Sequence, residues 1–198
     1  GDDEPVDEFV YDPETPVPTL GGNVGQLPGT VAGPVDRRPI QQRDDVLVYD
    51  TDVLTEDLEV TGSPLVTLWA SSDCTDTDFA ATVCDVHEDG RAIIVCEGMV
   101  RARFSQERQD PSASRENPKL AVPGLVSKYF VSLWHTSVVF KAGHRIRLEL
   151  TSSNFPRFDR NLNTGHDLGV DAQVRSAENR VYHNGAYPTH LTLPVVER

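Results

Sequence analysis

The stretch from Asp78 to Phe104 reads DFAATVCDVHEDGRAIIVCEGMVRARF, with two apolar, β-branched runs on either side of the dipeptide Asp89-Gly90. This dipeptide tolerates the positive φ of a tight hairpin turn. Both faces of the predicted hairpin are largely apolar, so we expect it to lie inside a sandwich of two stacked sheets, covered on both sides. For a two-residue loop, the predicted cross-strand pairs are Val86 with Ile93, Cys84 with Val95, and Val83 with Cys96.

The three cysteines, Cys74, Cys84 and Cys96, cannot all pair within one chain. A sparse, odd number of cysteines points weakly to a reducing compartment. Cys84 and Cys96 flank the turn, and a three-residue loop would place them opposite each other. Buried free cysteine is the commoner state, so we expect free thiols and keep a Cys84–Cys96 disulfide as the alternative. No CxxC or HxxxH spacing occurs, and no metal site or cofactor is predicted.

The chain after Asp45 contains further short runs typical of strands, separated by turn residues, and no helical pattern persists for three turns. In the run from 144 to 153, alternation predicts Ile146, Leu148 and Leu150 inward, and Arg145, Arg147 and Glu149 outward. Trp69 and Trp134 lie in apolar strand contexts and are predicted to be in the core. These features predict an all-β domain, a jelly-roll β-sandwich. The runs are 45–51, 58–72, 79–104, 128–140, 144–153, 181–185 and 189–196.

Residues 1–43 are rich in Pro, Gly, Asp and Glu. Proline fixes φ and lacks a backbone donor, so we predict extended coil and turns that pack on the domain surface. A linker is favoured over a binding arm. The domain organisation is therefore an extended linker at 1–43 followed by the sandwich at 44–198, and residues 108–123 form a long polar loop.

The net charge is −13, from 18 Lys and Arg against 31 Asp and Glu. Such a surface repels phosphates at long range, which argues against nucleic-acid and anionic-membrane partners. No apolar run approaches the roughly 18 residues that a spanning helix needs, so we expect a soluble chain. No signal peptide is visible, and the first residues read as though cut from something longer. We expect a cytoplasmic location and leave a secreted protein open.

The loop SSNFPRFDRNLNTG, residues 152–165, concentrates hydrogen-bonding side chains directly after a predicted strand. It suggests an active site, but the chain has no GxSxG nucleophile motif, and its six histidines are scattered along the sequence. A lone histidine such as His144 is interpreted as structural. We therefore predict no catalytic residue here. Instead, Asp159 and Arg160 are expected to brace the loop, while Asn154, Asn161 and Asn163 satisfy backbone groups.

A second acidic motif, DCTDTDF, places Asp73, Asp76 and Asp78 within six residues. Their carboxylates could hold Ca²⁺, but the EF-hand glycine and terminal glutamate are absent. Aspartate also commonly bonds its own loop backbone. We favour a structural role and count Asp76 and Asp78, with the loop residues above, as candidates for loop bracing or domain contact.

Several segments together resemble the C-terminal domain of the Xaa-Pro dipeptidyl-peptidase and cocaine esterase family of serine hydrolases. They are FVYDPETPVPTLGG, QRDDVLVYDTDVLTEDLEVTGSP, SSDCTDTDFAATVCDVHEDGRAI, FKAGHRIRLELTSSNFPRFDRNLNTG and HLTLPVV. The resemblance covers nearly the whole chain, in order and spacing. It implies a jelly roll of galactose-binding-like topology. It also implies a serine hydrolase whose triad lies outside this sequence, so that this chain alone is inactive.

The resemblance further implies that the domain packs against an α/β-hydrolase catalytic domain and a helical cap, walls the substrate cleft and stabilises the enzyme. A homo-oligomer stays open. The substrate would be an N-terminal Xaa-Pro dipeptide, a small ester or an acyl amide. The alternative function is an autonomous carbohydrate-binding module, because the fold class commonly hosts sugars and the loop carries Asn, Asp and Arg. A Ca²⁺-stabilised module is a third hypothesis.

Overall fold

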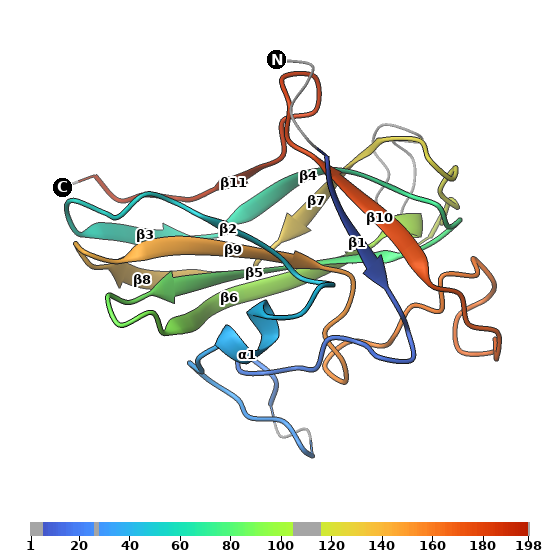
Figure 1. Ribbon diagram of the computed structural model, residues 1–198, viewed down its shortest axis with the longest axis horizontal. Coiled ribbons are helices and arrows are strands. Elements are labelled where there is room, and N and C mark those ends of the chain that lie inside the picture. Colours follow the sequence, from blue (N-terminus) through green and yellow to red (C-terminus); the bar gives the residue numbers. More distant parts are fainter. Residues whose placement is uncertain (1–5, 26–27, 105–115, 198) are drawn as a thin grey trace.

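The computed structural model describes residues 6–25, 28–104 and 116–197 (Figure 1). Within these ranges the chain is nearly all β, with one short α-helix and one 3₁₀ turn. No helix in these ranges is long and apolar enough to cross a membrane. The predictions for 108–115 fall outside the described residues.

The hairpin predicted at Asp89-Gly90 lies at the centre of the fold. Its strands belong to a four-stranded antiparallel sheet of order β2-β9-β5-β6. Its strand β5 pairs with β6 and β9 on its two edges and is buried along most of its length, because both faces are covered. The strands are β2 (Leu47–Asp50), β5 (Asp78–Val86), β6 (Ala92–Arg101) and β9 (Arg145–Thr151).

The register of this hairpin differs from the prediction near the turn. Val83 faces Cys96 as predicted, but a β-bulge follows, so that Cys84 faces Ile94 and Val86 faces Ala92. The pairs Cys84 with Val95 and Val86 with Ile93 are therefore wrong, because a bulge inserts one unpaired residue into one strand. All three cysteines are free and buried.

The second sheet has five antiparallel strands in the order β1-β10-β4-β11, with β7 on the other edge of β4. Both β10 and β11 pair with β4, β10 along its C-terminal half and β11 along its N-terminal half. The strands are β1 (Asp7–Tyr11), β4 (Leu65–Ser72), β7 (Ser127–Ser132), β10 (Ala177–Tyr182) and β11 (His190–Thr192).

A two-stranded sheet of β3 (Leu58–Gly62) and β8 (Thr136–Phe140) completes the sandwich. The largest apolar cluster takes residues from all three sheets, among them Leu68, Val83, Leu148 and Phe140. In the view of Figure 1, β2, β9, β5 and β6 run below β4 and β11. The β-sandwich prediction is thus confirmed, while the jelly-roll and galactose-binding-like labels remain predictions.

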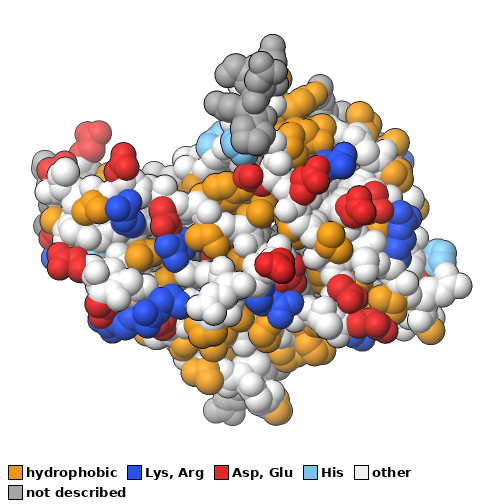
Figure 2. Space-filling view, viewed as in Figure 1, with side chains coloured by type: hydrophobic (Ala, Val, Ile, Leu, Met, Phe, Trp, Pro, Cys, Tyr) orange, Lys and Arg blue, Asp and Glu red, His pale blue; other side chains and the backbone are white. Residues whose placement is uncertain are grey.

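The segment before residue 44 contributes more than the predicted coil. It supplies β1, which pairs with β10, and the short helix α1 (Arg38–Gln41). Part of this segment pairs with the free edge of β6, where the Ile94 amide donates to the Val35 carbonyl. A small cluster of buried apolar residues fills the outer face of the hairpin: Cys84, Val86, Ala92 and Ile94. The hairpin is therefore covered on both sides, as predicted. In Figure 2 hydrophobic side chains gather at the lower end, over the region around α1.

The alternation of β9 is as predicted for Ile146, Leu148 and Leu150, which are buried in the core. Glu149 points outward as predicted, but it does not reach solvent, because its side chain is only 1% exposed. It points to the outer face, which the segment around α1 covers. Arg37 therefore meets it there as a buried ion pair.

The two tryptophans differ from their core prediction. Trp69 is half-buried, and its ring lies 5.5 Å from that of Tyr187. Trp134 is 67% exposed and has a φ of 64°, in the left-handed region, between the ends of β7 and β8. A single residue with positive φ breaks the period-2 alternation that placed Trp134 in the core.

Candidate functional site

A buried polar network lies beneath the loop at 152–165 and connects it to β5 and β6. The Asp76 carboxylate accepts from Arg103 at 2.7 Å, and the Asp78 carboxylate accepts two hydrogen bonds from Arg101 at 2.8 and 2.9 Å. The Asn161 amide donates to both carboxylates, at 3.0 Å to Asp76 and 2.8 Å to Asp78. Both aspartates are 1% exposed or less, so each charge is neutralised within the domain.

Burial dominates the electrostatics of this network. It raises the pKa of the Asp78 carboxyl above its ordinary value, against the opposing effect of the Arg101 and Asn161 hydrogen bonds. Burial alone would lower the pKa of Arg101, but the bonds to Asp78 hold it above its usual range. Both carboxylates are buried and paired with guanidinium groups of the domain, which fits a network that fixes a loop.

The three asparagines of the loop use both backbone and side-chain partners. The side-chain amide of Asn163 donates to the Arg175 carbonyl at 2.7 Å. The backbone amide of Asn163 donates to the side-chain oxygen of Asn161 at 2.9 Å. Asn154 instead donates to Glu97 at 2.6 Å and accepts from the Thr19 hydroxyl at 2.7 Å. The prediction of backbone partners therefore describes Asn163 and part of Asn161, but not Asn154.

The Asp159–Arg160 pair does not act as one unit. Arg160 donates to the Pro13 carbonyl at 2.8 Å and lies over the Phe155 ring, which links the loop to the N-terminal segment. Asp159 is exposed. Among the hydrogen bonds of the described residues, Asp159 contributes only its backbone oxygen, which accepts from Arg101 Nη2 at 3.4 Å. Bracing of the loop thus comes from Arg160.

The third aspartate of the acidic motif has a different partner. Asp73 bonds to Arg175 at 2.8 Å, whereas Asp76 and Asp78 bond to Arg103 and Arg101. A guanidinium on each carboxylate competes directly with a bound cation. The geometry therefore gives no support to a Ca²⁺ site at these three residues.

Arg157 of the loop also lines a cavity of about 590 Å³. Its wall combines the segments at 22–25 and 32–34 with β6 and with Leu133, Trp134 and His135. Glu97, which is 4% exposed, forms an ion pair with Arg157 at its inner end. This cavity could not be predicted from local sequence patterns, because its lining residues run from Gly22 to Arg157.

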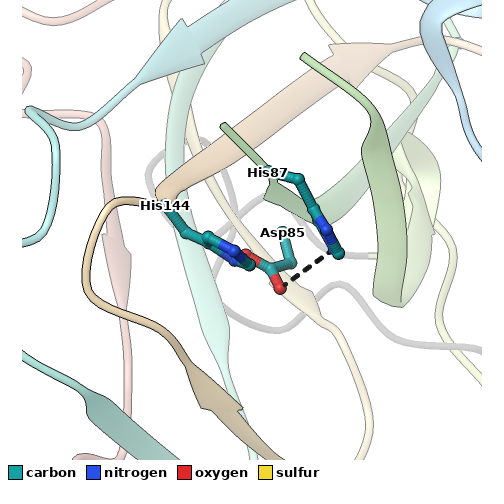
Figure 3. A group of neighbouring side chains, drawn as sticks. All are labelled: Asp85, His87 and His144. Carbon is teal, nitrogen blue, oxygen red and sulfur yellow. Dashed lines mark hydrogen bonds and ion pairs between the residues drawn. The ribbon is translucent and has the colours of Figure 1, made fainter. Parts of the chain in front are cut away.

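Three side chains, Asp85, His87 and His144, lie close together near one end of β5 (Figure 3). The two histidines belong to different hairpin turns and are far apart in the sequence. His144 Nδ1 lies 2.8 Å from Asp85 Oδ1, and His87 Nε2 lies 3.6 Å from Asp85 Oδ2. The two imidazoles stack with their centroids 4.4 Å apart. The sequence analysis did not predict this cluster. Finding it requires the pairing of β5 with β9, which sets Asp85 opposite Ile146 and so brings His144 close to Asp85.

One serine–histidine contact also occurs. Ser63 Oγ lies 2.6 Å from His135 Nδ1 at an exposed turn. A hydrolytic triad needs a third group that orients the histidine. The hydrogen bonds found among the described residues join no carboxylate to His135, so this contact does not make a catalytic set.

Comparison with known proteins places these features in a family. The model of the X-Pro dipeptidyl-peptidase C-terminal non-catalytic domain matches residues 3–192. The cocaine esterase of Rhodococcus sp. (strain MB1 Bresler) is 42% identical over 197 residues, which are 98% of this chain and 33% of that protein. The chain thus spans about a third of the length of this relative.

Two solved structures share the fold. An aminopeptidase from the marine sediment archaeon Thaumarchaeota archaeon superposes with a TM-score of 0.82 at 29% identity, over 98% of this chain and 33% of that one. An α-amino acid ester hydrolase gives 0.81 at 28% identity, over 96% of this chain and 32% of that one. The chain therefore belongs to the family of X-Pro dipeptidyl-peptidase C-terminal non-catalytic domains.

Proposed function

We propose that this chain is the noncatalytic C-terminal β-sandwich of a larger serine hydrolase, which it stabilises and whose substrate cleft it helps to wall. The observation that carries the proposal is the family match over residues 3–192, together with similarity to a cocaine esterase three times as long. The names of the similar proteins include an esterase, an aminopeptidase and an ester hydrolase. The proposed substrate class is accordingly small esters or N-terminal amino acid derivatives.

The proposed partners are a catalytic α/β-hydrolase domain and a helical cap on the same polypeptide. The face around the cavity of 590 Å³ suits such a contact. Of the residues that line the cavity, Trp134 exposes 67% of its surface, beside the polar groups of Glu97 and Arg157. An apolar patch with buried polar anchors is typical of a surface that another domain covers.

The test compares this chain with the full-length protein on a nitrophenyl ester and on a Gly-Pro chromogenic amide. We expect no turnover by the chain alone and turnover of at least one substrate by the full-length protein. Trp134→Ala in the full-length protein should weaken activity or stability, whereas Val10→Ala, which changes an exposed side chain on β1, should alter neither. Robust, inhibitor-sensitive hydrolysis by the chain alone would contradict the proposal.

A second candidate function, an autonomous carbohydrate-binding module, gains one observation. An exposed aromatic ring beside polar side chains is the usual platform for a sugar, and Trp134 provides such a ring next to Glu97 and Arg157. A thermal-shift screen with monosaccharides tests it. Saturable binding that Trp134→Ala abolishes would support the candidate, and no binding at millimolar sugar would remove it.

A further inference from the structure

We propose that Asp85, His87 and His144 form a binding site for a divalent transition metal ion of the Zn²⁺ class. Two imidazoles and one carboxylate are ligands that Zn²⁺, Co²⁺ and Ni²⁺ prefer over Ca²⁺ or Mg²⁺. In the described part of the chain this is the group of three such side chains whose ligand atoms lie within 4.8 Å of one another. The proposal is independent of the hydrolase function.

The distances suit a metal ion. A tetrahedral ion with ligands at about 2.0–2.1 Å places its ligand atoms roughly 3.3 Å apart. The two contacts to Asp85, 2.8 Å from His144 Nδ1 and 3.6 Å from His87 Nε2, lie on either side of this value. The three ligand atoms all lie within 4.8 Å of one another, so the longest separation has to close by at most about 1.5 Å before all three can reach one ion.

The backbone holds the ligands on two rigid turns. The His87 carbonyl accepts from Gly90, and the His87 amide donates to Arg91, which closes the β5–β6 turn. In the β8–β9 turn, the His144 amide donates to the Lys141 carbonyl at 3.0 Å. Asp85 lies on β5 between the turns, so the three ligands come from paired strands and need little ordering on binding.

The surroundings are accessible and acidic. The side chain of His87 is 30% exposed, while those of His144 and Asp85 are 15% and 14% exposed, so an ion can enter and water can complete its coordination. The Glu88 side chain packs closely against Gly143: a Cβ added to Gly143 would lie 2.3 Å from Glu88 Oε1. Its carboxylate adds negative charge on the turn that carries His144.

One neighbour opposes the ion. Arg91 Nη2 lies 3.5 Å from His87 Nδ1, and the same guanidinium bonds to Asp89 at 2.7 Å. The Arg91 side chain is 49% exposed, so it can turn toward Asp89 and solvent when a cation binds. A bound ion would join the β5–β6 turn to the β8–β9 turn and so clamp this end of the sandwich.

The experiment titrates Zn²⁺ into the untagged, chelator-stripped chain by calorimetry and follows Co²⁺ by its visible absorption. We expect one ion per chain, with affinity reduced about tenfold or more in His87→Ala and in His144→Ala. Asp85→Asn, which keeps the shape and removes the charge, should also weaken binding. The matched control is His166→Ala, because His166 forms a similar pair with Asp171 at 2.9 Å but has no second histidine.

Thermal unfolding without metal shows whether each variant is folded. The rise in Tm on adding Zn²⁺ should be smaller in His87→Ala, His144→Ala and Asp85→Asn than in the original chain, and unchanged in His166→Ala. Unchanged affinity in His87→Ala or His144→Ala would overturn the proposal. Equal loss in His166→Ala would overturn it as well, because binding would then be spread over surface histidines.

Discussion

Arg37 and Glu149 are 112 positions apart in the chain, yet they form a buried ion pair with Nη2 and Oε2 2.7 Å apart. Gln41 from α1 donates to the same carboxylate at 2.7 Å. Burial alone would lower the pKa of Arg37, but the Glu149 carboxylate outweighs it, and the pKa lies above its ordinary value. The pair fixes the N-terminal segment to the outer face of β9.

Glu149→Ala should therefore destabilise the domain by about 3–5 kcal/mol, because it leaves the Arg37 charge buried without a partner. Replacing both residues with apolar ones, Arg37→Met with Glu149→Leu, should cost less than the single change. Urea unfolding of the three proteins measures the differences in the free energy of unfolding. The exposed pair Arg180 and Glu8 is the control, and Glu8→Ala should leave the midpoint nearly unchanged. A double variant no more stable than Glu149→Ala would contradict this account.

Asn161→Ala should cost about 1–3 kcal/mol, because the Asp76 and Asp78 carboxylates each lose a buried donor. Asp159→Asn, a change in the same loop at an exposed position, should have almost no effect on unfolding. If both substitutions shift the unfolding midpoint equally, the loop is held by something other than this network.

Burial raises the pKa of the thiols of Cys74 and Cys96 to about 12 and raises that of Cys84 well above its ordinary value. An unfolded chain loses these protons above a pKa of about 8.5, whereas the folded chain keeps them. The free energy of unfolding should therefore fall as pH rises above this value, by up to about 1.4 kcal/mol per pH unit for each thiol.

The pH effect is measured by urea unfolding at about pH 8 and about pH 9.5, below the titration of most tyrosines and lysines. The double variant Cys84→Ala with Cys96→Ala should show a smaller decrease. In the same range Ellman's reagent should react slowly with the native chain and rapidly, at three thiols, with the unfolded one. Fast reaction of the native protein would show that the thiols are accessible.

Gly98→Ala should destabilise the domain by about 1–3 kcal/mol. A Cβ on Gly98 would lie 1.9 Å from the Ser132 carbonyl oxygen, a backbone atom that cannot rotate away, so β6 and β7 would have to separate. Gly185→Ala is the matched control, since a Cβ there has no heavy atom within 4 Å. Differential scanning calorimetry should show a lower Tm for the first variant and an unchanged or slightly higher Tm for the second.

The strands were predictable because burial imposes a period of two. The alternation of Ile146, Leu148 and Leu150 and the turn at Asp89-Gly90 depend on neighbours in sequence, and the structure confirms both. The exact pairing near the turn was not predictable, because nothing local marks the bulge after Val83.

The errors at the candidate sites have a common physical cause. Glu149 reads as an outward charge because the residue that neutralises it, Arg37, lies far away in the sequence. His87 and His144 read as isolated for the same reason, and Trp134 reads as core because a positive φ leaves no sequence signature except in glycine. The partners of the polar loop residues depend on the fold, because they come from distant segments of the chain.

The N-terminal segment also decides where the domain can be cut for recombinant expression. A protein trimmed at residue 44, where the strand-rich sequence starts, would lose the strand β1 from the edge of β10 and the cover over Ile94. Without β1, the edge of β10 would be open. The trimmed protein would also keep Glu149 but lose Arg37, which leaves the Glu149 charge without its partner on a face lined by apolar side chains. The cooperative unit for any such experiment, including domain exchange between relatives, therefore reaches back through Asp7.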